Sequence, residues 1–145
     1  MSKALQYTTF SIGHDQYAIE VGHVQEITRS FNVTPVRLSP PYIKGLVNLR
    51  GQLSVAVDVR TLVQDKSEAT PDWMSIVCRR EESLVSLVVD RIGDVIEVQP
   101  EQIVPPPESI GKSKSALVTE VIKTEDRLIS VLNFNHVWRE LCQKL

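Results

Sequence analysis

Apolar residues recur at every second position in short runs along most of this chain, and turn residues separate the runs. Phe10 and Ile12 alternate with polar neighbours, and Tyr17 and Ile19 do so again after a turn that begins at Gly13. A period of two is typical of a strand with one buried face, because successive side chains of a strand point to opposite sides of the sheet. The chain is therefore expected to be mostly β and to begin with a hairpin.

The same pattern predicts a second hairpin around Gly51. This glycine supplies the backbone freedom that a tight turn between two strands requires. Four apolar residues after the turn are expected on one strand face: Leu53, Val55, Val57 and Val59. Residues 64–72 are polar and contain a proline, so they are interpreted as a linker between two halves.

The second half continues in short strands. Residues 84–90 are apolar at both parities, which indicates a strand buried on both faces. The segments 117–122 and 128–132 are predicted to pair as a third hairpin. Residues 100–115 hold four of the eight prolines and are expected to form an extended loop.

Only the end of the chain has helical periodicity. The apolar spacing there is i, i+3, i+4, i+7, i+8 and i+11, at Phe134, Val137, Trp138, Leu141, Cys142 and Leu145. Asn133 or Asn135 can cap this helix, because an asparagine side chain accepts hydrogen bonds from the free amides of a first turn.

Short strands with regular turn signals are typical of barrels or sandwiches. We therefore expect an all-β fold in a single domain over residues 1–145. Its first barrel subdomain would span residues 5–63, its second would span 73–132, and a short C-terminal helix would cover 134–144. Two barrels of this size cannot hide every apolar residue, so the surplus is expected either between the barrels or on an exposed binding patch.

Charge and hydropathy argue against a nucleic-acid-binding, a membrane-spanning or a secreted protein. A formal net charge of −2 argues against a general nucleic-acid binder, which needs a basic face. No apolar stretch approaches the roughly 20 residues that cross a bilayer, and the N-terminus lacks the pattern of a signal peptide. Cys78 and Cys142 are therefore expected to be reduced, and both are interpreted as small core residues.

The sequence contains no constellation that predicts catalysis. His14, His23 and His136 share no metal-ligand spacing with one another, with the cysteines or with an acidic cluster. Neither an enzyme activity nor a metal or other cofactor is expected.

Residues 45–51, Gly-Leu-Val-Asn-Leu-Arg-Gly, together with Val57-Asp58-Val59, resemble the signature of the CheW-like domain, the family of bacterial chemotaxis coupling proteins. Further parts of the family pattern follow in order across nearly the whole chain: residues 17–19, 24–27, 87–90 and 128–132. Departures at Ser86, Thr119 and Asn133 leave open whether the chain serves flagellar chemotaxis, type IV pilus motility or another chemosensory pathway.

The resemblance implies two SH3-like, five-stranded β-barrels around a shared hydrophobic core. It implies an adaptor without enzymatic activity that couples the cytoplasmic tip of a methyl-accepting chemoreceptor to the regulatory domain of a CheA-type histidine kinase. The protein would be cytoplasmic, in receptor arrays at the inner face of the cell membrane, without inserting into it. The receptor tip would lie in a groove between the barrels, and the kinase domain on barrel edges whose residues the resemblance does not assign.

Eight residues are the candidates for the receptor groove: Val24, Glu26, Ile27, Ile43, Gly45, Val47, Asn48 and Arg50. An apolar groove suits the i, i+3, i+4, i+7 anchors of a helix, although each aliphatic candidate can equally be an ordinary core residue. Glu26 and Arg50 are predicted to pair beside the groove. Gly45 is expected either to allow a close backbone approach at the groove or simply to begin a strand.

The alternative function, from a different class, is a nucleic-acid-binding barrel of the OB type. Such a barrel needs aromatic and basic residues on one sheet face. This chain has three Phe, three Tyr and two Trp, and it lacks a basic stripe.

Overall fold

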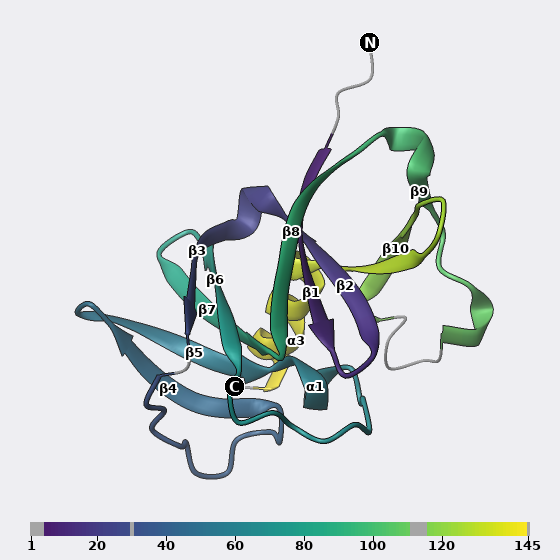
Figure 1. The fold of residues 1–145 in the computed structure, drawn as a ribbon. Helices are drawn as coiled ribbons and strands as arrows, with labels where there is room; N and C mark the ends of the chain where they lie inside the picture. Colours follow the sequence, from purple (N-terminus) through teal and green to yellow (C-terminus); the bar gives the residue numbers. More distant parts are fainter. Residues whose placement is uncertain (1–4, 30, 111–115, 145) are drawn as a thin grey trace.

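The computed structural model describes residues 5–29, 31–110 and 116–144, and its strands form two sheets (Figure 1). The six-stranded sheet has the order β8 (Arg91–Val98), β1 (Leu5–Ile12), β2 (Asp15–Glu20), β11 (Leu128–Leu132), β10 (Val118–Lys123) and β9 (Ile103–Val104). The five-stranded sheet has the order β3 (Val24–Arg29), β6 (Met74–Arg80), β7 (Ser83–Val89), β5 (Gln52–Asp58) and β4 (Ile43–Leu49). The helical elements are η1 (Val21–His23), α1 (Val59–Leu62), η2 (Pro100–Gln102), η3 (Glu108–Ile110) and α3 (Phe134–Lys144).

The two sheets do not follow the sequential division into residues 5–63 and 73–132. The first hairpin, β1–β2, pairs with β8 and with β11, whereas β6 and β7 pair with β3 and β5. The five-stranded sheet is thus built from the continuous stretch 24–89, which is inserted into the six-stranded sheet. The parallel pairings β2–β11 and β5–β7 join distant segments, and local turn signals carry no information about them.

A hydrophobic core shared by the two sheets holds them together. Phe10 and Tyr17 enter it from the six-stranded sheet, Val57 and Leu87 from the five-stranded sheet, and Phe134 from α3. Each of these side chains is at most 2% exposed. Figure 1 shows α3 lying between the two sheets. The expected shared core is therefore present, and the terminal helix completes it.

Each sheet also encloses a small core of its own. Tyr7, Ala18 and Ile129 belong to the core of the six-stranded sheet. Val47 and Ala56 belong to that of the five-stranded sheet. Side chains on alternate faces of the same strand thus fill different cores, which explains why β7 is buried at every position after its first residue, as its sequence predicts.

The five-stranded sheet curls until its edges meet. Thr34, beyond the end of β3, exchanges two backbone hydrogen bonds with Leu46 of β4, at 2.8 and 2.9 Å. A Cβ atom at Gly45 would lie 2.2 Å from the Thr34 carbonyl oxygen, and Gly45 has a φ of +147°. The backbone does come close at Gly45, but what approaches is the chain's own Thr34, so this glycine allows the barrel to close.

Several local predictions are confirmed. All three hairpins form, and α3 spans the predicted residues. The Asn133 side-chain oxygen accepts a hydrogen bond from the His136 amide at 3.1 Å, as a cap does. The proline-rich stretch is less extended than expected, because η2, β9 and η3 form within it, and residues 111–115 lie outside the described part.

Two positions differ from the prediction. Cys142 is exposed, whereas Cys78 is buried as expected. The helix α3 packs through Phe134, Val137 and Leu141, and Cys142 lies about 100° around the helix from Leu141. Val59, expected on the strand, begins α1, because the Asp58 side chain accepts a hydrogen bond from the Arg60 amide and caps that turn.

Candidate functional site

The apolar face of β5 is buried in the shared core at one end of the strand and exposed to solvent at the other. Val57, Val55 and Leu53 lie on the same side of β5, at alternate positions. Val57 is fully buried, Val55 is half-buried against the shared core, and Leu53 is 64% exposed. The sequence placed these three residues on one face, and the structure adds that the face leaves the core toward the β4–β5 turn.

The neighbouring strand extends this exposed surface. Leu46 of β4 is the register partner of Val55, and it is 36% exposed. We call Leu46, Leu53 and Val55 the hairpin face. Figure 1 shows the β4–β5 hairpin extending away from the six-stranded sheet, so a partner can approach it. Neither Leu46 nor Leu53 is among the groove candidates that the sequence offers, although the two-residue turn fixes their register.

The turn that ends this hairpin is held by side chains from two directions. Arg50 and Gly51 form the turn with φ of +53° and +86°, which is the backbone of a type I′ hairpin. The Asn48 side-chain oxygen accepts a hydrogen bond from the Gly51 amide at 2.8 Å. Asn48, a groove candidate, thus shapes the turn from within the hairpin.

The predicted pair of Glu26 and Arg50 is present. The Arg50 guanidinium donates to the Glu26 carboxylate, and this hydrogen bond raises the pKa of Arg50. Glu26 comes from β3, at the opposite edge of the five-stranded sheet, so the contact spans the closure of the barrel. The Arg50 side chain is 77% exposed, which leaves it accessible beside the hairpin face.

The four aliphatic groove candidates have different environments. Ile43 and Val47 are 7% and 3% exposed and belong to two different cores, so the interpretation as core residues applies to them and they present no surface. Val24 is half-buried against the shared core. Ile27 is 42% exposed on the edge strand β3. Alternation places Val47 inside the barrel because it is the register partner of Ser54, whereas Leu46 points out.

Histidine, cysteine and acidic side chains do not gather into a metal-binding cluster in the described segments. No group of three or more His, Cys, Asp or Glu side chains there could hold a metal ion. The His23 ring lies 5.2 Å from the Phe134 ring, and His136 Nδ1 lies 2.9 Å from the Ala116 carbonyl oxygen. Burial raises the pKa of Tyr7 to about 12, with contributions from Glu120 and Glu20.

Taken together, two small β-barrels that share a core and leave an apolar hairpin face exposed define a protein-interaction module. None of the described helices is long and apolar enough to span a membrane.

Comparison with known proteins identifies the family. The CheW-like domain matches residues 6–142, so the chain belongs to the CheW-like domain family. A chemotaxis protein CheW of Bacillus subtilis is 30% identical, over 88% of this chain and 83% of the relative. One of Helicobacter pylori is 27% identical, over 95% of this chain and 84% of the relative.

A solved structure agrees with this assignment. The scaffolding protein TtCheW from Thermoanaerobacter tengcongensis superposes with a TM-score of 0.79 at 25% identity, covering 92% of this chain and 90% of that chain. The chain is thus a scaffold protein of the chemotaxis type, as the resemblance implied. The all-β fold with a short C-terminal helix is confirmed, although β9 brings one sheet to six strands. The alternative of an OB-type nucleic-acid-binding barrel has no support in these comparisons.

Proposed function

We propose that this chain couples chemoreceptors to a CheA-type histidine kinase, and that the hairpin face binds the helical cytoplasmic tip of the receptor. The observation that carries this proposal is the exposure of Leu53, which is 64% accessible on a strand whose next outward residues enter the shared core. A side chain anchored on a rigid strand gives a partner a fixed apolar contact, so little ordering is required when the complex forms.

The chemistry of the hairpin face suits an amphipathic helix. Such a helix presents apolar side chains at i, i+3, i+4 and i+7, which fit a narrow apolar strip with polar margins. Leu46 and Leu53 provide the strip, while Asn48 and Arg50 provide hydrogen-bonding margins at the turn. The Glu26–Arg50 pair would then fix the turn against which the receptor lies.

Two other exposed aliphatic side chains, both on the six-stranded sheet, are less suited to this role. Val95 and Leu128 are 56% and 59% exposed, but they lie on β8 and β11, which two other strands separate in the six-stranded sheet. Each is therefore a single apolar residue, and scattered single residues are ordinary on protein surfaces.

The kinase regulatory domain is proposed to bind strand edges away from the hairpin face, so that receptor and kinase can bind together. The chain itself would supply no catalytic group. Its location would be the cytoplasmic side of the membrane, where receptor tips lie. Individually weak contacts would gain avidity when receptors, kinases and scaffold proteins assemble into an array.

Calorimetry with the purified full chain tests the proposal. Titrations with a receptor cytoplasmic tip and with the kinase regulatory domain are expected to show saturable binding to each. The proposal is wrong if neither titration shows binding and co-purification from cells also recovers neither protein.

A further inference from the structure

The chain passes between the two sheets at two places in the described residues. The first is η1, between β2 and β3, and the second is Asp90, the single residue between β7 and β8. A one-residue connection keeps the ends of β7 and β8 close together. The two backbone dihedrals of that residue determine the angle at which the strands, and with them the sheets, meet. What holds Asp90 therefore affects how the sheets are placed.

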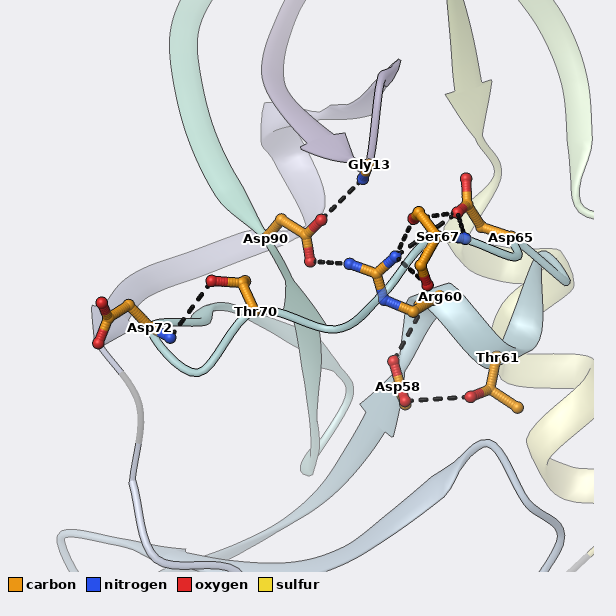
Figure 2. Close-up of polar contacts among 9 residues, drawn as sticks. All are labelled: Gly13, Asp58, Arg60, Thr61, Asp65, Ser67, Thr70, Asp72 and Asp90. Atoms are coloured by element: carbon orange, nitrogen blue, oxygen red, sulfur yellow. Dashed lines mark hydrogen bonds and ion pairs between the residues drawn. The ribbon is translucent and has the colours of Figure 1, made fainter.

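Asp90 is held from both sheets at once (Figure 2). One carboxylate oxygen accepts a hydrogen bond from the backbone amide of Gly13, in the β1–β2 turn of the six-stranded sheet, at 2.7 Å. The other accepts from Arg60, in the short helix α1 that follows β5 of the five-stranded sheet. The Asp90 amide also donates to the Ser11 carbonyl oxygen at 3.1 Å.

Arg60 reaches a third segment through its other terminal nitrogen. That nitrogen donates to the Ser67 carbonyl oxygen at 3.0 Å, contacts the Ser67 hydroxyl, and lies 3.5 Å from the Asp65 carboxylate. Figure 2 shows the guanidinium between Asp90 on one side and Asp65 and Ser67 on the other. The predicted linker 64–72 is therefore not a free connection, since its first half is fixed to α1.

The same segment packs tightly against the six-stranded sheet. Gly13 has a φ of +60°, and a Cβ atom there would lie 2.4 Å from the Ser67 hydroxyl oxygen. A larger residue than glycine would require the Ser67 side chain or the β1–β2 turn to shift. The two sheets thus meet at a polar junction formed by Gly13, Arg60, Asp65, Ser67 and Asp90.

The burial of this junction gives it geometric specificity. The Arg60 side chain is 9% exposed and that of Asp90 is 16% exposed, so their charges have little access to water. A buried charge is tolerated only when its hydrogen-bonding groups are matched, and a planar guanidinium matches them in one orientation. The packing of the shared core already holds the sheets together, and this junction adds directional hydrogen bonds to that packing.

We propose that Arg60 is a positioning residue that sets the angle between the two sheets by holding the Asp90 crossing against the β1–β2 turn. In the scaffold this angle fixes the hairpin face relative to surfaces on the six-stranded sheet, a consequence that rests on the proposed function. Arg60 itself need not touch a partner.

Two substitutions at the junction and one matched control test the proposal. Arg60→Lys keeps the charge but cannot reach Asp90 and Ser67 together, and Asp90→Asn keeps the shape but removes the carboxylate. Arg127→Lys is the control, because Arg127 donates to Gln16 at 2.8 Å within the six-stranded sheet and does not join the two sheets. If Arg60→Lys fails to fold, the isosteric Asp90→Asn decides the outcome.

The readout is a distance between the sheets, measured by pulsed electron spin resonance on the full chain. Spin labels are placed at the exposed positions Glu82→Cys, in the β6–β7 turn, and Glu97→Cys, in β8, in a Cys142→Ser background. Cys78 is buried and its pKa is raised to about 12, so it resists labelling.

We expect the distance distribution to be narrow in the parent and in Arg127→Lys, and to broaden or shift in Arg60→Lys and Asp90→Asn. An ordinary stabilising role would lower the melting temperature of the junction variants without changing this distribution, and that result would overturn the proposal. Binding of the receptor tip and kinase domain is measured separately. Failure of the parent to bind either would contradict the proposed function, while the distance measurement would still decide the role of Arg60.

Discussion

Replacing Leu53 with serine removes the most exposed apolar side chain of the hairpin face. Burying a whole leucine side chain contributes about 1.5–3 kcal/mol. Leu53 is 64% exposed in the free chain, so the part that a partner can newly cover contributes about 1–2 kcal/mol. The dissociation constant for a receptor tip is therefore expected to rise by about 5- to 30-fold.

Isothermal titration calorimetry of the variant against the receptor tip measures this change, and Leu128→Ser provides the matched control. Leu128 is 59% exposed, close to the value of Leu53, but it lies on β11 of the other sheet. Both variants should keep the parent melting temperature nearly unchanged, because exposed side chains contribute little to folding. The reasoning is refuted if Leu53→Ser binds as tightly as the parent, or if Leu128→Ser weakens binding by the same factor.

Four further predictions concern the fold. Gly45→Ala should lower the free energy of unfolding by about 1–3 kcal/mol, because the added Cβ would clash with the Thr34 carbonyl and the φ of residue 45 is +147°. An unchanged urea midpoint would show that the barrel closes differently. Phe134→Ala should cost about 3–5 kcal/mol in urea unfolding, and a loss below about 1 kcal/mol would mean that α3 does not complete the shared core. In the folded chain a thiol reagent should modify Cys142 and spare Cys78, because burial raises the pKa of the Cys78 thiol from 9.0 to about 12. Since the unfolded thiol ionises first, stability should fall as the pH rises from 9 toward 12, and a Cys78→Ala variant should lose that part of the pH dependence.

Turns, the helix and its cap could be predicted from the sequence, because each depends on a few consecutive residues. Gly13 and Gly51 mark turns with positive φ, and both hairpins form there. The 3.6-residue period after Asn133 predicted α3, and its cap is Asn133, one of the two residues expected. The pairing of Glu26 with Arg50 was predicted from the family pattern, and the contact is present.

The distribution of strands between the sheets could not be read in this way. Strands β2 and β11 pair in parallel although more than one hundred residues separate them, and only their shared burial selects that pairing. For a related reason the sequence left open whether Val47 lies in a core or in the groove. Shifting a strand by one residue exchanges its two faces. The candidates for the groove therefore include Val47, which points into the barrel, and omit the exposed Leu46 and Leu53.

The contacts of Arg60 could not be predicted from sequence patterns either. It follows a strand, and the expected linker contains its partners Asp65 and Ser67. Nothing in the spacing of these residues relates them to Asp90 or to the turn at Gly13. The fold brings the segments together, and only then do their charges and hydrogen-bonding groups match.

Nuclear magnetic resonance of the isotope-labelled full chain, titrated with a receptor cytoplasmic tip, tests most directly where the partner binds. We expect the largest chemical-shift changes at Leu46, Leu53 and Val55, with smaller changes at the Arg50–Gly51 turn. Changes confined to the six-stranded sheet, around Val95 or Leu128, would show that the hairpin face is not the docking surface.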